Sequence, residues 1–185
     1  TANAGDIAGN TNTVAENKTY LALGQDLTQD QLNAVLSLMG ITADKLANYN
    51  VVYVTNADEH AYLDTYLDPA VIGKRSLSSV LVRPASTGHG VTVKTQNINF
   101  CTETMYQNAL ITAGVTDADV LVVGPSPISG TAALIGALKA YERMSGQTVS
   151  DKALDTALNE LVTTGQLSEA VGSDSQAEEI ISYVK

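Results

Sequence analysis

Residues 119–143, DVLVVGPSPISGTAALIGALKAYER, contain the pattern that decides the fold. The apolar run 120–123 predicts a short strand that is buried on both faces. Gly124, Pro125 and Pro127 predict the end of that strand. A helix is expected to start within Ser129-Gly130-Thr131, because the residues that follow place Leu134, Leu138 and Tyr141 on one face. The stretch therefore predicts a strand, a turn and a helix that packs on a sheet.

The turn between this strand and this helix is the candidate ligand site. Backbone N–H groups at the start of a helix bind anions, and hydroxyl side chains add hydrogen bonds. The turn 124–131 is therefore a candidate site for a carboxylate or a phosphate, formed by Gly124, Ser126, Ser129, Gly130 and Thr131. The turn has neither the lysine of a P-loop nor the spacing of a dinucleotide-binding motif. A purely structural turn, in which the Ser129 hydroxyl caps the helix, is the alternative.

A repeated pattern of helix, strand and helix organises the rest of the core. Residues 28–40 and 102–114 each predict a helix that begins at a threonine cap and ends at a glycine. Each is followed by a short apolar strand, at 51–54 and 120–123, and then by another helix. The repetition indicates either an old duplication or two similar solutions to one packing problem.

Further segments complete the predicted sheet. Residues 20–23 predict a short edge strand, and residues 77–83 and 91–98 predict a hairpin joined by the loop 84–90. Asn56 is the expected cap of the helix after strand 51–54. The fold class that follows is α/β, with α+β as the alternative: a mixed β-sheet with packed helices and a helical C-terminal segment.

The chain divides into three parts. Residues 1–18, rich in Thr, Asn, Ala and Gly, predict a flexible leader. Residues 19–146 predict the α/β core. Residues 147–185 predict a helical segment of the same domain: one helix starts at Ser150 with Leu154, Ala157, Leu158 and Leu161 facing inward, and another starts near Ser175.

Charge and cysteine content exclude some classes of partner. The formal net charge of −10 opposes binding to nucleic acid and to anionic membrane surfaces. No apolar run is long enough to cross a membrane. The single Cys101 excludes an intrachain disulfide, and the neighbouring Glu103 is expected to raise the pKa of its thiol.

The reactive residues form no catalytic or metal-binding pattern. His60 and Asp64, one turn apart, are typical of a helix-surface pair, since two ligands seldom suffice to bind a metal. His89 lies in a glycine-flanked loop that we expect to be solvated. Ser126 stands between prolines and lacks the surrounding glycines of a nucleophile elbow. We therefore predict no catalytic residue, no metal and no cofactor, and the residues favour a binding domain over an enzyme without deciding between them.

Several short stretches between residues 20 and 145 form a recognisable series. They are LGQDLT at 23–28, VTN with DE and YL between 54 and 63, IGKRS at 72–76, NAL and AG between 108 and 114, and PISGTAAL at 127–134. In this order they resemble the YpuA-like family of bacterial proteins, domain of unknown function 1002. Members of this family are typically exported by Gram-positive bacteria. The resemblance therefore implies an extracellular or cell-envelope location after removal of a signal. It implies no catalytic residues.

Three functions follow as hypotheses. The first is a secreted or wall-associated binding domain without catalytic activity, which binds a small anion or a cell-envelope component. The second is an enzyme or sensor that binds an anion at the turn 124–131. The third is a structural or assembly module in which the C-terminal helices pack against another subunit.

Overall fold

The computed structural model describes residues 19–146, 148–150, 152–159 and 163. Its strands are β1 (Tyr20–Gly24), β2 (Asn50–Val54), β3 (Ser79–Pro84), β4 (Val91–Ile98) and β5 (Ala118–Ile128). Its helices are α2 (Gln29–Met39), the 3-10 helix η1 (Ala43–Asn48), α3 (Asn56–Leu63), α4 (Pro69–Ile72), α5 (Glu103–Ala113) and α6 (Thr131–Ser145). Residues 152–159 are also helical.

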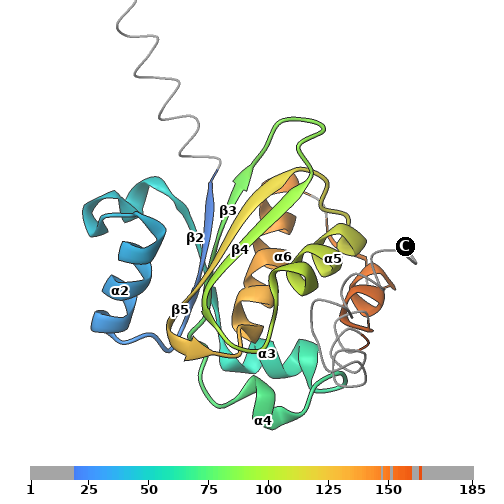
Figure 1. Ribbon diagram of the computed structural model, residues 1–185, viewed down its shortest axis with the longest axis horizontal. Coiled ribbons are helices and arrows are strands. Elements are labelled where there is room, and N and C mark those ends of the chain that lie inside the picture. The colour runs from blue at the N-terminus through green and yellow to red at the C-terminus, as the bar shows by residue number, and fades with distance from the viewer. Residues whose placement is uncertain (1–18, 147, 151, 160–162, 164–185) are drawn as a thin grey trace, which may run out of the picture.

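The elements form three layers around one sheet. Helix α2 covers one face, and α6 lies along the other face with α5 and α3 beside it (Figure 1). The strand order is β2-β1-β3-β5-β4. Strand β3 is antiparallel to both of its neighbours, whereas β1 pairs parallel with β2, and β4 pairs parallel with β5. The predicted α/β fold with a mixed sheet and packed helices is confirmed.

Two predicted strand arrangements are wrong. Strand β1 is not at the edge, because it pairs with β2 on one side and β3 on the other. Strands β3 and β4 do not form a hairpin, because β5 lies between them and pairs with both. The segment that joins β3 to β4 passes the end of β5, where Ala85 N–H donates to the Asp117 carbonyl.

Strand β5 continues past the residues that were expected to end it. It runs to Ile128 and includes Gly124, Pro125 and Pro127. Beyond Val123 it has no partner in β3, since the register with β3 ends at the pair Ser79–Val123. Prolines, which lack an N–H, are tolerated where a strand has an unpaired edge. The β4 register is irregular there as well, between Gln96 and Ile98.

The predicted caps of the helices are largely confirmed. The cap and capping box of α2 and the cap of α5 form at Thr28 and Thr102, and both helices end at a left-handed glycine. The cap of α3 is Thr55 rather than Asn56, because Thr55 accepts from the Asp58 N–H and Asp58 accepts in return. The Asn56 side chain is thereby released for other contacts.

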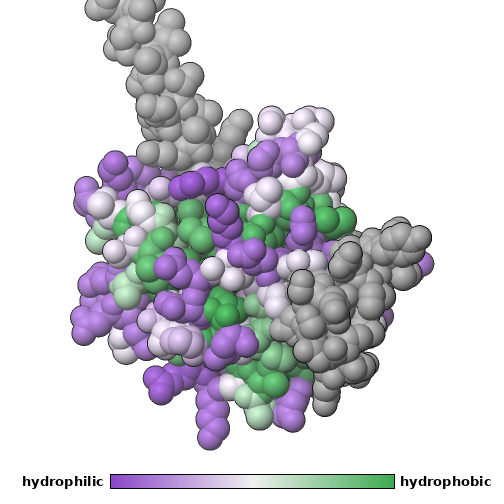
Figure 2. Space-filling model, viewed as in Figure 1, coloured by the Kyte–Doolittle hydropathy of each residue, from purple (hydrophilic) through white to green (hydrophobic). Residues whose placement is uncertain are grey.

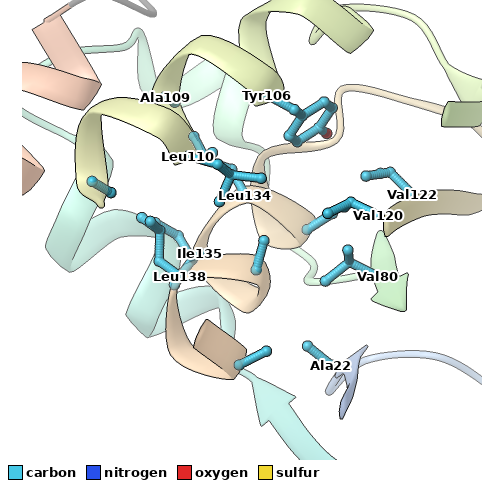
Figure 3. Close-up of a cluster of buried hydrophobic side chains, with 14 of the residues drawn as sticks. Ala22, Val80, Tyr106, Ala109, Leu110, Val120, Val122, Leu134, Ile135 and Leu138 are labelled. Atoms are coloured by element: carbon cyan, nitrogen blue, oxygen red, sulfur yellow. The ribbon is translucent and has the colours of Figure 1, made fainter. Parts of the chain in front are cut away.

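Two apolar clusters fill the layers. The smaller lies between α2 and the sheet and includes Leu21, Leu81 and Val123. The larger lies between the sheet and α5 and α6, where side chains of all three meet (Figure 3). Ala157 and Leu158 of the helix 152–159 are buried in this larger cluster, as predicted. The predicted leader, Leu161 and the helix near Ser175 lie outside the described residues.

The two helix–strand–helix units differ in three dimensions. Between β1 and β2 the chain crosses over the face that α2 covers, and between β4 and β5 it crosses over the opposite face with α5. Both crossovers join parallel strands and step in the same direction along the sheet. Crossovers on opposite faces then have opposite hands, although right-handed connections predominate. This difference favours two similar packing solutions over a duplication.

No helix among the described residues is both long and apolar enough to cross a bilayer.

Candidate functional site

A pocket of about 510 Å³ opens where β5 ends and α6 begins. One side is formed by Ser129, Gly130 and Thr131, which connect the strand to the helix. The opposite side is formed by α4 and by residues 73–78, which connect α4 to β3. Asn99 and Phe100, which follow β4, close a third side. Three segments far apart in the sequence thus meet around one hollow.

The structure places the five predicted site residues in two groups. Ser129, Gly130 and Thr131 line the pocket. Gly124 and Ser126 do not line it and lie earlier in β5. Gly124 is buried, and a Cβ atom there would lie 2.6 Å from the Asn97 carbonyl oxygen, whereas Ser126 is exposed.

The first turn of α6 has an unusual cap. Its N-cap residue is Gly130, with φ +91°, and no side chain of the cap bonds the helix. Ser129 therefore does not cap the helix as the structural alternative required. The hydroxyl of Ser78, from the connection before β3, accepts from the Ala133 N–H at 2.8 Å. Among the described residues, the N–H groups of Thr131 and Ala132 have no acceptor.

Tyr106 holds the turn in place. Its hydroxyl donates to the Gly130 carbonyl at 2.5 Å, and the Cys101 N–H donates to the Ser129 carbonyl at 3.0 Å. Tyr106 is fully buried, so this bond lies inside the larger cluster. Burial also raises the pKa of the Cys101 thiol to about 12. The predicted direction of that shift is confirmed, but its cause is burial and not Glu103.

Glu59 lines the pocket from α3. It is 1% exposed, and its two oxygens accept from the Thr131 hydroxyl at 2.8 Å and from the Asn56 amide at 3.0 Å. Burial raises the pKa of this carboxyl above its ordinary value. Sequence reasoning missed Glu59, because nothing near position 59 distinguishes it from a solvent-facing residue of the first helical turn.

Two cationic side chains, Lys74 and Arg75, also line the pocket. Both are exposed, and within the part of the chain that the structure describes neither has an ion-pair partner. Sequence reasoning missed them as well, since two adjacent basic residues in an acidic chain are no signal without the fold. Together with Glu59 they give the pocket a formal excess of one positive charge.

The segment that carries these cations is tied to α3. The Gly73 carbonyl oxygen is 3.1 Å from the Asn56 amide nitrogen and 2.9 Å from His60 Nε2. On the other side, the Ser76 N–H donates to the Asp26 carboxylate at 2.8 Å. The backbone around Lys74 and Arg75 is therefore held at both ends.

The remaining wall of the pocket is apolar. Val71, Leu77, Phe100 and Ile128 line it and are half-buried. Figure 2 shows hydrophobic residues reaching the surface over α4, between hydrophilic ones. The pocket therefore offers apolar contacts beside its charged groups.

Both histidines lie away from this lining. His60 Nδ1 lies 2.6 Å from Asp64 Oδ1 on the surface of α3, as predicted. His89 is exposed, as expected, and it also lies 2.8 Å from Asp119, a pairing that was not predicted. Within the described ranges, no three His, Cys, Asp or Glu side chains are grouped so that they could bind a metal.

Comparison with known proteins gives two matches. The model of the family described as "Protein of unknown function (DUF1002)" matches residues 23–185. The chain is 43% identical to the "Uncharacterized protein YpuA" of Bacillus subtilis (strain 168) over 157 residues, which are 85% of this chain and 53% of that protein. The chain thus spans about half the length of this relative. No solved structure matches it.

Proposed function

We propose that this chain, which belongs to the DUF1002 family of proteins of unknown function, is a non-enzymatic binding domain for a small anion that carries an apolar group. The observation that carries this proposal is the pocket at the start of α6, whose lining combines two cations that have no ion-pair partner among the described residues with several apolar side chains. The description of the family does not name a ligand.

The charges of the pocket support an anion. Lys74 and Arg75 each provide a positive charge that has no ion-pair partner in the described part of the chain, and the dipole of α6 adds partial positive charge at Thr131. A carboxylate fits this arrangement, because the guanidinium of Arg75 can bind it in a bidentate manner. The net negative charge of the protein repels anions from the surface in general. Lys74 and Arg75 place positive charge locally at the pocket.

The apolar wall supports a group larger than an inorganic ion. Phe100 is the single phenylalanine of the chain, and it stands half-buried beside Ile128 and Leu77. Covering such side chains is favourable at about 25 cal/mol per Å² of apolar surface. An aromatic or branched aliphatic carboxylate would use both the cations and this wall.

The contacts of Glu59 support binding over catalysis. Both of its oxygens already accept hydrogen bonds, and neither His60 nor His89 lines the pocket to act with it. The raised pKa of Glu59 nevertheless favours a second candidate, an enzyme in which this carboxyl transfers a proton. A screen with 4-nitrophenyl esters tests it: turnover that disappears in Glu59→Gln would support the enzyme and contradict the binding domain.

Calorimetric titration of the protein with phenylacetate tests the proposal. We expect saturable binding that weakens at least about tenfold in the double variant Lys74→Ala/Arg75→Ala. The double variant Lys45→Ala/Lys94→Ala removes the same charge outside the pocket lining and is the matched control. Absence of binding, or equal weakening in both double variants, would contradict the proposal.

The apolar wall has its own test. Phe100→Ala should weaken binding of phenylacetate but leave that of acetate unchanged, because acetate has almost no apolar surface to lose. Equal effects on both ligands, or no effect on either, would contradict binding of the phenyl group by this wall.

We also propose an extracellular or cell-envelope location. The resemblance to a family of exported proteins supports it, and the buried free thiol of Cys101 is compatible with it. Fractionation of cells that produce the full-length protein tests this location. Recovery with cytosolic markers alone would contradict it.

A further inference from the structure

The hydrogen bonds of His60 carry an inference about the pocket that the proposed function does not contain. Nδ1 of the ring is 2.6 Å from the Asp64 carboxylate, and Nε2 is 2.9 Å from the Gly73 carbonyl oxygen. A carboxylate and a backbone carbonyl can only accept hydrogen bonds. Both bonds therefore exist together only when both ring nitrogens carry protons, that is, when His60 is an imidazolium.

We infer that protonated His60 is a positioning residue for the anion pocket: it fixes Gly73, and with it Lys74 and Arg75, and releases them when the ring loses its proton. The inference rests on the proposed function, because it concerns the regulation of the same pocket. His60 itself does not line the pocket and acts through Gly73.

Loss of one proton from His60 affects the two bonds unequally. The bond to Asp64 is charge-assisted and short, so the remaining proton stays on Nδ1. The lone pair of Nε2 then faces the Gly73 carbonyl, and two acceptors repel each other. Among the described side chains, Asn56 then remains the donor to that carbonyl. Deprotonation thus loosens the segment that carries both cations.

The charged groups around His60 favour the imidazolium. On α3, Asp64 lies against the ring and Glu59 precedes it in the chain, and both raise the pKa of His60 together with the Gly73 carbonyl. The Gly73 carbonyl, at the C-terminal end of α4, faces the ring. Asp68, at the N-terminal end of α4, accepts a hydrogen bond from the Ala70 N–H. From α6, Lys139 is paired with Asp58.

The sign of the pH effect follows from this arrangement. A raised pKa in the folded protein means that the bonds are complete at low pH and are lost as pH rises through that pKa. An anion in the pocket prefers the state in which Lys74 and Arg75 are fixed and His60 is charged. By linkage, a bound anion must raise the pKa of His60 further.

Proton NMR of the whole chain tests the inference, because the sequence has only two histidines. Phenylacetate remains anionic between about pH 5.5 and 9, so it serves as the probe. We expect the pKa of His60 to rise measurably in saturating phenylacetate. The substitution Asp64→Asn should lower the pKa of His60, and His60→Gln should assign its signal.

A second readout needs no ligand. The amide signals of Lys74 and Arg75 should shift with pH along the His60 titration curve and should lose that shift in His60→Gln. The glutamine can still donate to Gly73 without titrating, so the variant should bind phenylacetate with less dependence on pH above neutrality. This readout keeps the inference testable if phenylacetate does not bind at any pH, an outcome that would remove the proposed function alone. The inference would be overturned if the amide signals of Lys74 and Arg75 did not shift as His60 titrates. It would also be overturned if phenylacetate bound without changing the pKa of His60.

Discussion

The hydroxyl of Tyr106 donates to the carbonyl of Gly130 at 2.5 Å, and a Cβ atom at position 130 would lie only 2.2 Å from that same hydroxyl. The two residues thus require each other. Gly130 allows the backbone to approach a buried phenol, and the phenol satisfies the carbonyl that begins α6. Since Gly130 also has φ +91°, the position excludes a side chain for two independent reasons.

The substitution Gly130→Ala should lower the free energy of unfolding by about 2–4 kcal/mol, because overpacking adds to the strain of the left-handed backbone. Denaturant unfolding measures this loss. Gly88→Ala is the matched control, since Gly88 has φ +90° and open space around its missing Cβ. Equal losses in the two variants would show that the contact with Tyr106 costs nothing.

Cys101 should resist thiol reagents in the folded protein. It is 2% exposed, and its pKa is raised from 9.0 to about 12, so near pH 8 the thiolate fraction falls about 1000-fold. Labelling with a chromogenic disulfide reagent should therefore be at least that much slower than in denaturant. Rapid labelling under native conditions would contradict the burial of this thiol.

Local signals predicted the helices well and the sheet order poorly. The cap at Thr28 and the glycine stop at Gly40 act within a few residues, so the sequence shows both partners of each contact. The pairing of β3 with β5 joins residues about 40 positions apart, and nothing near Val82 indicates Val120 as its partner. The hairpin prediction was wrong because it assumed that strands adjacent in the sequence pair with each other. Here β5 lies between β3 and β4.

The candidate site was predicted in part for the same reason. Ser129, Gly130 and Thr131 follow from a local pattern, the turn from a strand into a helix. Glu59, Lys74 and Arg75 reach that turn only through the packing of α3 and α4 beside it. The residues next to them in the sequence do not indicate how close they lie to Thr131 in the fold. No local rule could therefore have placed them in one pocket.

Gly136 shows the same limit within a predicted helix. The predicted face of this helix carried Leu134, Leu138 and Tyr141, but the helix also approaches the sheet closely at Gly136, where a Cβ would lie 2.7 Å from the Ala22 Cβ. We expect Gly136→Ala to lower the free energy of unfolding by about 1–2 kcal/mol, although alanine is the better helix former by about 1 kcal/mol. In Ala22→Gly/Gly136→Ala, part of this loss should be recovered. Strict additivity of the two substitutions would contradict the contact.

The last prediction concerns Glu59, whose burial raises its pKa above the ordinary value of 4.5. Between that value and the raised pKa, the folded protein holds a proton that the unfolded chain has already lost. Folding is therefore favoured at the low end of this window, and stability falls as pH rises through it. The same titration creates a negative charge beside the pocket, so affinity for phenylacetate should fall over the same window.

The substitution Glu59→Gln should remove both effects. We expect the free energy of unfolding of the wild type, measured relative to that of Glu59→Gln, to decrease with pH through the window and then to level off. At the high end, Glu59→Gln should bind phenylacetate more tightly than the wild type, because its amide carries no charge to repel the ligand. Asp30→Asn removes one exposed charge on α2, away from the pocket, and should leave both pH profiles unchanged. Parallel profiles for the wild type and Glu59→Gln would mean that this carboxyl keeps the same charge throughout, and that any pH dependence of binding has another origin, of which His60 is the first candidate.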